Sequence, residues 1–283
     1  MEKALHRQAM MGRFFQNLIL YIVLVGIAVI MVGPFFWMAT TAIKPMKEVY
    51  IYPPKFIPTR LSLENLLEVM KLIPIWRYLA NTAYIAIVGT LGQLAVCTMA
   101  AYAFSRLKFP GRDLIFTLYL GTMMIPFGVE MIPLFVLVSK VGWQDSYQAI
   151  VVPGLASAFG TFLLRQFFLT IPTELEDAAR IDGAGRLRFL VTILVPLSAP
   201  ALTTLGIFNF LGRWNEFLWP MLILRTQDKY LIQLGLARFT TQYTSSTHLM
   251  MTGATISVIP LLVVFLVAQR YFVRGVILSG LKG

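Results

Sequence analysis

The stretch of sequence from Phe14 to Ile43 reads FFQNLILYIVLVGIAVIMVGPFFWMATTAI and contains no charged residue. A helix of about 20 apolar residues crosses the hydrocarbon core of a bilayer, so this run is long enough to span it. It is also too long to be the apolar core of a cleavable signal peptide. We therefore predict a helix that stays in the membrane, preceded by a short cytoplasmic segment, residues 1–13.

The composition of the whole chain agrees with a membrane protein. Of its 283 residues, 58% are hydrophobic and 13% are charged, whereas about a quarter of a soluble domain is charged. The net charge is +11, but the basic residues lie between apolar runs and form no patch, which favours membrane orientation over nucleic-acid binding. The single cysteine, Cys97, lies in an apolar run and is interpreted as a packing residue.

Charge-free runs recur along the sequence and lack the alternating pattern of a membrane barrel, so each is predicted to be a helix. Pro34, Pro126 and Pro133 lie inside these runs and predict kinks, or backbone that faces a water-filled cavity. The expected fold is an all-α membrane domain over residues 14–283 with six transmembrane helices: Phe14–Thr41, Tyr78–Phe104, Leu114–Ser139, Tyr147–Leu164, Pro200–Leu224 and Leu249–Ala268.

An even number of spans places both termini on one side. With the termini in the cytoplasm, the short inner segments carry slightly more Lys and Arg than the outer loops, which favours this orientation. The outer loops 44–77 and 225–248 are long, and such loops are often functional; plain solvated connectors are the alternative. The residues Ser62–Glu68 predict a short capped helix in the first of them.

The segment Ile171–Leu190, between the fourth and fifth predicted spans, reads IPTELEDAARIDGAGRLRFL. Thr173 and Glu176 have the spacing of a capping box, and the acidic residues that follow Thr173 favour a helix start. Gly183 is expected to end the helix in a left-handed conformation. A short, charged helix followed by a sharp turn suits docking into a cleft of a soluble partner, although an ordinary surface helix remains open.

This segment resembles a known family. Asp177-Ala178-Ala179, then Gly183, then Ile193 and Pro196 are similar to the "EAA–Gly–Ile–Leu-Pro" loop of binding-protein-dependent ABC importer permeases. Asp177 stands for the usual Glu and Val195 for the usual Leu, and both changes keep the chemistry.

The resemblance extends over nearly the whole chain. It is closest to the carbohydrate importers, in particular to the smaller permease subunit of the maltose or glycerol-phosphate type. The stretches that carry it are Leu175–Ala184, Phe159–Leu163, Trp214–Glu216 and Gln269–Gly275.

What the resemblance implies is a coupling role for the loop. In such permeases the loop helix sits in a groove of a separate ATP-binding subunit, and ATP-driven closure of two such subunits switches the cavity from inward- to outward-facing. The residues implied in this contact are Glu176, Asp177, Ala178, Ala179, Asp182, Gly183 and Ala184.

The resemblance also implies partners and cofactors. No Gly-Lys dipeptide occurs in the chain, so it has no Walker A phosphate loop. We therefore expect no enzyme activity and no cofactor on this chain, with ATP and Mg on two copies of a partner ATPase. A second, unlike permease subunit and an extracytoplasmic solute-binding protein complete the expected complex, in a bacterial or archaeal cell membrane, with no nucleic acid.

Ionisable residues at membrane depth are costly and suggest function. Arg213 and Glu216 are three residues apart in the fifth predicted span, so they share a face of the helix and are able to pair. With Trp214, Asn215 and Trp219 around them they are candidates to line a sugar path, or else they anchor the span at the outer interface. Glu130 faces the same two alternatives.

Three further polar residues have structural interpretations. Asn81 and Gln93 are expected to join helices by hydrogen bonds rather than line the path, and Arg165 is expected to extend its charged end toward the interface.

Rival functions are less well supported. An ion-coupled secondary transporter would show repeated halves with broken helices and no docking loop. A membrane enzyme lacks a plausible catalytic cluster, because the only histidines are His6 and His248. The alternative within the importer class is another solute, such as an amino acid or a peptide.

Overall fold

The computed structural model describes residues 2–241 and 246–280, and within these ranges the regular secondary structure is entirely helical. The predicted all-α class is therefore confirmed. The chain divides into two compact units, residues 1–73 with 239–256 and residues 74–238 with 257–283. Each unit is described by itself below.

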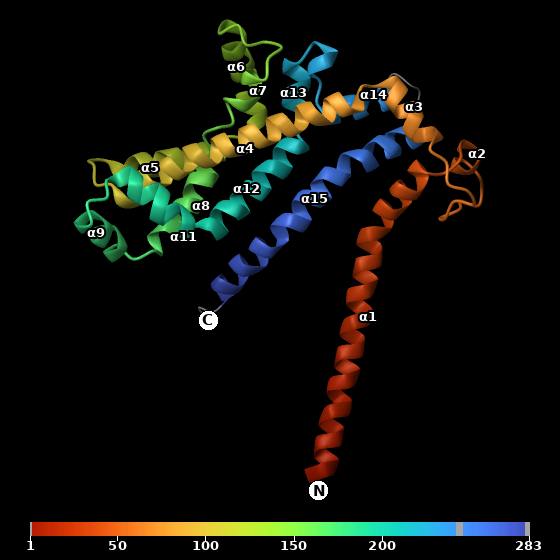
Figure 1. Cartoon of the computed structure of the whole chain (residues 1–283), viewed down its shortest axis with the longest axis horizontal. Helices are drawn as coiled ribbons and strands as arrows, with labels where there is room; N and C mark the ends of the chain where they lie inside the picture. The colour runs from red at the N-terminus through yellow and green to blue at the C-terminus, as the bar shows by residue number, and fades with distance from the viewer. Residues whose placement is uncertain (1, 242–245, 281–283) are drawn as a thin grey trace. The chain divides into compact units, whose positions relative to one another are not determined.

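The first unit is built on the long helix α1 (Glu2–Ala42) and contains α2 (Met46–Val49), α3 (Glu64–Leu72) and the start of α15 (Thr247–Gly280). The apolar part of α1, Phe15–Ala42, continues through Pro34, and its most apolar stretch is not buried inside the protein. These side chains are thus free to face lipid, as the first predicted span requires. Residues 2–13 belong to the same helix (Figure 1).

The helix α3 confirms the helix predicted after Ser62. The Oγ atom of Ser62 accepts a hydrogen bond from the backbone N–H of Glu64 at 3.2 Å. The side-chain Nδ2 of the buried Asn65 donates to the carbonyl oxygens of Thr41 and Lys44 at 3.1 and 3.0 Å. These bonds satisfy carbonyl groups at and beyond the end of α1 and fix α3 against them.

The second unit is organised around α4 (Ile75–Arg106), against which α8 (Ala158–Leu169) and α12 (Ala199–Trp214) pack (Figure 1). A Cβ atom added to Gly160 of α8 would lie 3.0 Å from the Sγ atom of Cys97, so the two helices approach closely there. Cys97 is fully buried, which confirms that it is a packing residue.

The third predicted span, Leu114–Ser139, is not one straight helix. It consists of α5 (Arg112–Gly121) with the short 3-10 turn η1 (Thr122–Met124), followed by α6 (Phe127–Lys140) at a bend of 100°. The bend lies at Ile125, whose ψ of 117° is extended, because a proline disfavours the helical conformation of the residue before it. The kink predicted at Pro126 is thus confirmed, whereas α6 continues through Pro133.

Two other predicted spans were wrong as continuous helices. The fourth, Tyr147–Leu164, is interrupted between α7 (Gln148–Val151) and α8, and Ser157 then caps α8 by accepting the N–H of Gly160. The fifth, Pro200–Leu224, ends as α12 at Trp214 and resumes as α13 (Leu218–Ile223). Pro153 and Gly154 fall in the first interruption and explain it.

The count of six spans is not reproduced by length and composition. In the described ranges three helices are long and apolar enough to cross a membrane: Phe15–Ala42, Ile75–Arg106 and Thr247–Val267. The number rises to five if the bent pairs Arg112–Lys140 and Arg186–Trp214 each count as one span. The helix α8 has 12 residues, which is short of the roughly 20 that a span needs.

The remaining elements of the second unit connect these helices. The helix α9 (Glu174–Ile181) follows α8, and α10 (Arg186–Phe189), the π-helical turn η2 (Leu190–Leu194) and α11 (Val195–Leu197) lead into α12 at a bend of 80°. After α13 come the 3-10 turn η3 (Gln227–Lys229) and α14 (Ile232–Thr241), whose last residues belong to the first unit.

Candidate functional site

The segment 171–190, called here the 171–190 loop, begins with a helix start that differs from the predicted one. Thr173 is itself in the helical conformation, and its side chain makes no capping bond. Its carbonyl oxygen already accepts the N–H groups of Glu176 and Asp177. The predicted capping box was therefore wrong: one Oε atom of Glu176 instead accepts the Tyr102 hydroxyl at 3.3 Å and Arg180 Nη2 at 3.4 Å.

The end of α9 is as predicted. Gly183 has φ +79°, the left-handed region that favours glycine. Its N–H donates to the carbonyl of Arg180 at 3.0 Å, and the N–H of Ala184 donates to the carbonyl of Ala179 at 2.8 Å. This pair of bonds is a Schellman motif, which satisfies the last helix carbonyls while the chain reverses.

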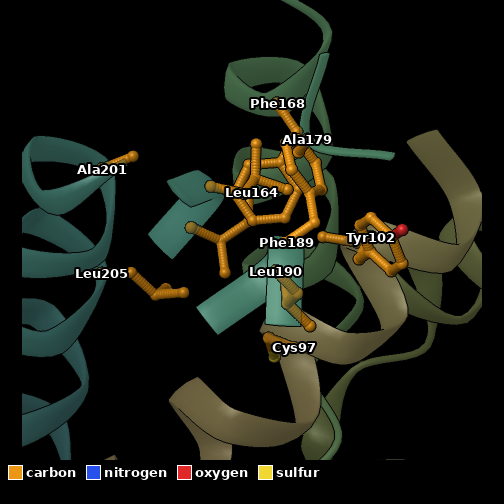
Figure 2. Packing of buried hydrophobic residues seen from close by; sticks show 11 residues of the cluster. Cys97, Tyr102, Leu164, Phe168, Ala179, Phe189, Leu190, Ala201 and Leu205 are labelled. Carbon is orange, nitrogen blue, oxygen red and sulfur yellow. The ribbon is translucent and has the colours of Figure 1, made fainter. Parts of the chain in front are cut away.

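One face of the loop is anchored in the core of the second unit. Ala179, Phe189 and Leu190 are buried together with Tyr102 of α4 and Phe168 of α8 (Figure 2). Close packing of this kind fixes the position of a segment because a shift of either partner opens voids. This packing therefore fixes the loop against α4 and α8.

A partly buried arginine strengthens this attachment. Arg106, at the end of α4, donates from Nη2 to the carbonyl oxygens of Phe168 and Ile171, at 2.8 and 2.6 Å. A cation at the carboxyl end of α8 satisfies carbonyl groups that have no partner within the helix.

The opposite face of the loop is exposed and partly apolar. Ile181 is 87% exposed and Leu187 is 70% exposed. Both lie next to turns, and neither belongs to an apolar run long enough to cross a bilayer. Asp177, Ala178 and Asp182 are exposed beside them. An exposed apolar pair rimmed by charged groups is typical of a protein contact surface.

A polar hollow of about 350 Å³ lies elsewhere in the second unit. Residues of α4, α6, α7, α12 and α13 and of the interruption after α7 line it. Its ionisable lining residues are Glu130, Arg213 and Glu216. The breaks in the predicted spans bring these elements together, because Pro153, Gly154 and Glu216 lie in or beside the interruptions.

Arg213 is held by the protein on two sides of the hollow. Its Nη2 atom donates to Gln93 Oε1 at 3.1 Å and to the carbonyl oxygen of Gly154 at 2.7 Å. A Cβ atom on Gly89 would lie 2.6 Å from Nη1, and one on Gly154 would lie 2.9 Å from Nη2. Both glycines therefore leave the space that the guanidinium occupies.

The predicted pairing of Arg213 with Glu216 was wrong, since no ion pair joins them in the described part of the chain. The helix ends at Trp214, so Glu216 lies beyond the regular spacing that puts residues three apart on one face.

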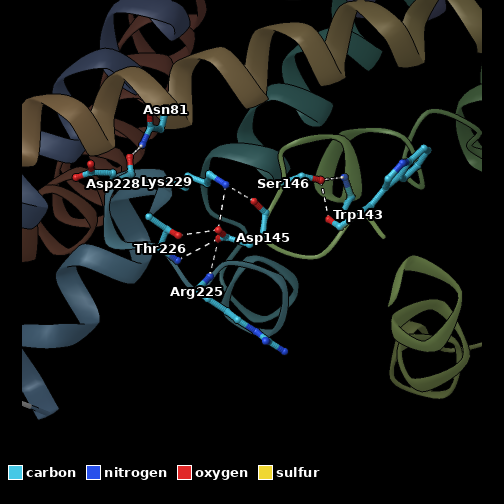
Figure 3. Close-up of polar contacts among 9 residues, drawn as sticks. Asn81, Trp143, Asp145, Ser146, Arg225, Thr226, Asp228 and Lys229 are labelled. Atoms are coloured by element: carbon cyan, nitrogen blue, oxygen red, sulfur yellow. Dashed lines mark hydrogen bonds and ion pairs between the residues drawn. The ribbon is translucent and has the colours of Figure 1, made fainter. Parts of the chain in front are cut away.

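The turn before α7 is joined to the segment after α13 by Asp145, which has φ +54° (Figure 3). Its Oδ1 accepts the N–H groups of Arg225 and Thr226 at 2.9 and 3.0 Å, and its Oδ2 accepts Thr226 Oγ1 and Lys229 Nζ at 2.6 and 3.0 Å. Partial burial alone would raise the pKa of Asp145, but these four donors outweigh it and hold the pKa below its ordinary value.

A sequence model of the family described as "Binding-protein-dependent transport system inner membrane component" matches residues 8–278. This chain belongs to that family. As an inner membrane component it is a multi-pass membrane protein, in agreement with its apolar helices.

Relatives of this inner membrane component agree with the assignment. It is 34% identical over 229 residues to the arabinooligosaccharides transport system permease protein AraQ of Halalkalibacterium halodurans, covering 81% of this chain and 82% of that one. It is 36% identical over 262 residues to the sn-glycerol-3-phosphate transport system permease protein UgpE of Escherichia coli, covering 90% and 93%. The resemblance to carbohydrate-importer permeases is thereby confirmed.

A solved structure has the same fold. A chain of a bacterial ABC transporter involved in the import of the acidic polysaccharide alginate superposes with a TM-score of 0.81 at 27% identity, covering 90% of this inner membrane component and 95% of that chain.

Of the five residues predicted to line a path in this inner membrane component, three line the hollow and two do not. Glu130, Arg213 and Glu216 line the hollow, whereas Trp214 is buried against Phe210 and Asn215 contacts Leu211 and Gln233. Trp219, predicted beside them, also lines the hollow, whereas the prediction missed Phe127 and Asn209. Helix contacts were favoured for Gln93, which both lines the hollow and accepts a hydrogen bond from Arg213 of α12. Asn209 stands one helix turn before Arg213, a spacing that was available in the sequence.

Two other polar predictions fall outside the hollow. Asn81 Nδ2 donates to the carbonyl oxygens of Asp228 and Tyr230, joining α4 to η3 and to the residue after it, as expected. Arg165 Nε donates to the carbonyl oxygen of Phe104, and its guanidinium lies 4.3 Å from the ring centre of Phe116.

Proposed function

We propose that the chain is a permease subunit of an ATP-driven, binding-protein-dependent importer of sugars or sugar-like solutes. The observation that carries the proposal is the 171–190 loop, which is anchored by Ala179 and Phe189 and presents Ile181 and Leu187 outward. The relatives named above, for arabino-oligosaccharides, glycerol phosphate and alginate, support the solute class.

In this proposal α9 is the coupling helix between the fourth and fifth spans. It docks on one of two ATPase copies, which bind the ATP and Mg, while this chain binds no cofactor and hydrolyses nothing. Since the loop is packed on α4 and α8, a displacement of the loop is transmitted to those helices as a rigid movement. The surface that contacts the ATPase is formed by exposed residues of the loop: Asp177, Ala178, Ile181, Asp182 and Gly183. Glu176 contributes indirectly, because it accepts a hydrogen bond from the Tyr102 hydroxyl and so holds α9 against α4.

The membrane arrangement that fits this role has both termini in the cytoplasm and six spans. The short helices α7 and α8 together supply the span that neither supplies alone. A second, unlike permease subunit completes the path, and an extracytoplasmic solute-binding protein delivers the solute to the outer side. The polar hollow then belongs to the translocation path.

The proposal is tested by copurification. Ile181→Glu places a charge in the proposed docking face and should remove the ATPase from a complex purified through a tag on this chain, with loss of uptake. Leu61→Glu is a matched control, because Leu61 is 73% exposed outside the loop. Normal copurification and uptake of the Ile181→Glu variant would contradict the proposal.

A further inference from the structure

The polar hollow has a charge composition that bears on which solute passes. Its ionisable lining residues are two carboxylates, Glu130 and Glu216, and one guanidinium, Arg213, so their formal charges sum to −1. No hydrogen bond or ion pair to either carboxylate occurs in the described part of the chain. The acceptor oxygens of both are thus available to a bound molecule.

The positive charge is less accessible than the negative ones. Arg213 is 7% exposed, whereas Glu130 is exposed and Glu216 is half-buried. Both Nη2 hydrogens of Arg213 are used by Gln93 and Gly154. An anionic solute therefore meets two carboxylates before it meets the guanidinium.

The rest of the lining suits a polyhydroxylated solute. Phe127 and Trp219 contact each other edge to face with ring centres 6.2 Å apart, and both line the hollow. A sugar hydroxyl donates as well as accepts, so it is able to donate to both carboxylates, while an apolar sugar face packs on the aromatic rings.

We infer that the hollow is a solute-binding site that selects neutral sugars over acidic ones, with Glu130 and Glu216 as the residues that exclude anions. The inference rests on the proposed function, since it assigns a solute class to the proposed path. It also separates this chain from its relatives named for sn-glycerol-3-phosphate and alginate, whose solutes are anionic.

The test uses the complete transport complex in lipid nanodiscs without the binding protein. Cellobiose and cellobiouronic acid, which differ by one carboxylate, are titrated and their binding is followed by saturation-transfer NMR. Cellobiose should bind at least tenfold more tightly than the acid. In the double variant Glu130→Gln, Glu216→Gln this preference should fall to less than threefold, because the carboxylates are neutralised while their shape is kept.

A matched control is the double variant Glu64→Gln, Glu68→Gln, which removes two charges from exposed residues of α3 and should keep the preference. Equal binding of both sugars, tighter binding of the acid, binding of neither, or an unchanged preference in the hollow variant would each overturn the inference. Copurification of the ATPase and binding-protein-driven uptake, measured on the same preparation, report on the proposed function separately.

Discussion

Nη2 of Arg213, near the end of α12, lies 2.7 Å from the carbonyl oxygen of Gly154, in the interruption between α7 and α8. A backbone carbonyl freed by a helix break would be costly in a membrane. Here the buried guanidinium of Arg213 donates to this carbonyl. The cation thus stabilises the helix break, and the freed carbonyl in turn gives the buried cation an acceptor. The two segments that this bond joins, α12 and the interruption after α7, are among those that line the polar hollow.

Enlarging Gly89 tests whether this arrangement matters. Gly89→Ala places a Cβ atom 2.6 Å from Arg213 Nη1, closer than packed atoms tolerate, so the guanidinium must move. We expect a loss of about 1–3 kcal/mol in stability, seen as a lower Tm of the purified complex, and reduced uptake. Gly121→Ala is the control, because a Cβ atom there meets nothing within 4 Å. Equal Tm and uptake for the two variants would disprove the arrangement.

Asp145→Asn tests the hydrogen bonds that join the turn before α7 to residues 225–229. The amide keeps the shape but loses the negative charge that accepts from Arg225, Thr226 and Lys229, and we expect about 1–3 kcal/mol of destabilisation in denaturant unfolding. Asp228→Asn serves for comparison: Asp228 pairs with Arg77 through side chains 60% and 55% exposed, and such a pair contributes about 0–1 kcal/mol. A larger effect at position 228 than at 145 would refute this ranking.

The same aspartate predicts a pH dependence. Its pKa is lower in the folded than in the unfolded chain, so the stabilisation is complete above the ordinary aspartate pKa of about 3.9. It is lost as the pH falls from there toward the lowered pKa. Acid unfolding of the wild type should therefore show a step below about pH 4 that is absent from Asp145→Asn. Identical acid profiles for the two proteins would rule this out.

Gly183→Pro tests the turn of the 171–190 loop. Proline cannot adopt a φ of +79° and has no N–H for the carbonyl of Arg180. We expect the chain to insert but to lose uptake and ATPase copurification. Gly185→Ala has an ordinary φ of −71° and open space around its Cβ atom, so it should retain both. Normal uptake by the proline variant would exclude a role for this turn in coupling.

Phe189→Ala tests how firmly the loop is attached. Phe189 is 2% exposed in the cluster with Ala179 and Tyr102, and truncation of a buried Phe costs about 3–5 kcal/mol. Ligand-free complexes should unfold at a lower temperature, and uptake per ATP hydrolysed should fall because the loop no longer moves with its helices. Leu118→Ala, at a position that is 66% exposed on α5 and outside the loop, should leave the Tm unchanged. Equal Tm values for the two variants would argue against the anchoring.

The sequence was sufficient for the helical class, the uninterrupted spans and the loop. Charge-free length alone located α1, α4 and α15, and Gly183 located the end of α9, because these features depend on local composition and backbone chemistry. The family followed from the spacing of the Ala178, Gly183 and Pro196 blocks.

The breaks were harder to predict because apolar length does not reveal where a helix stops. Pro126 pointed to one break, but the gap after Trp214 carries no proline at its start. This unpredicted gap places Arg213 and Glu216 on opposite sides of a helix end. The capping box failed for a related reason: Tyr102, far away in sequence, offers Glu176 a partner that local spacing cannot show.

Single-cysteine cross-linking tests the central claim most directly, that the exposed face of the 171–190 loop docks on an ATPase subunit. With Cys97 replaced by Ser, a short bifunctional reagent is applied to complexes that carry Ile181→Cys or, as a control, Leu114→Cys, which is 65% exposed on α5. We expect a cross-link to the ATPase from position 181, changed in yield by ATP, and none from position 114. A transport-competent complex in which position 181 gives no cross-link to the ATPase would contradict it.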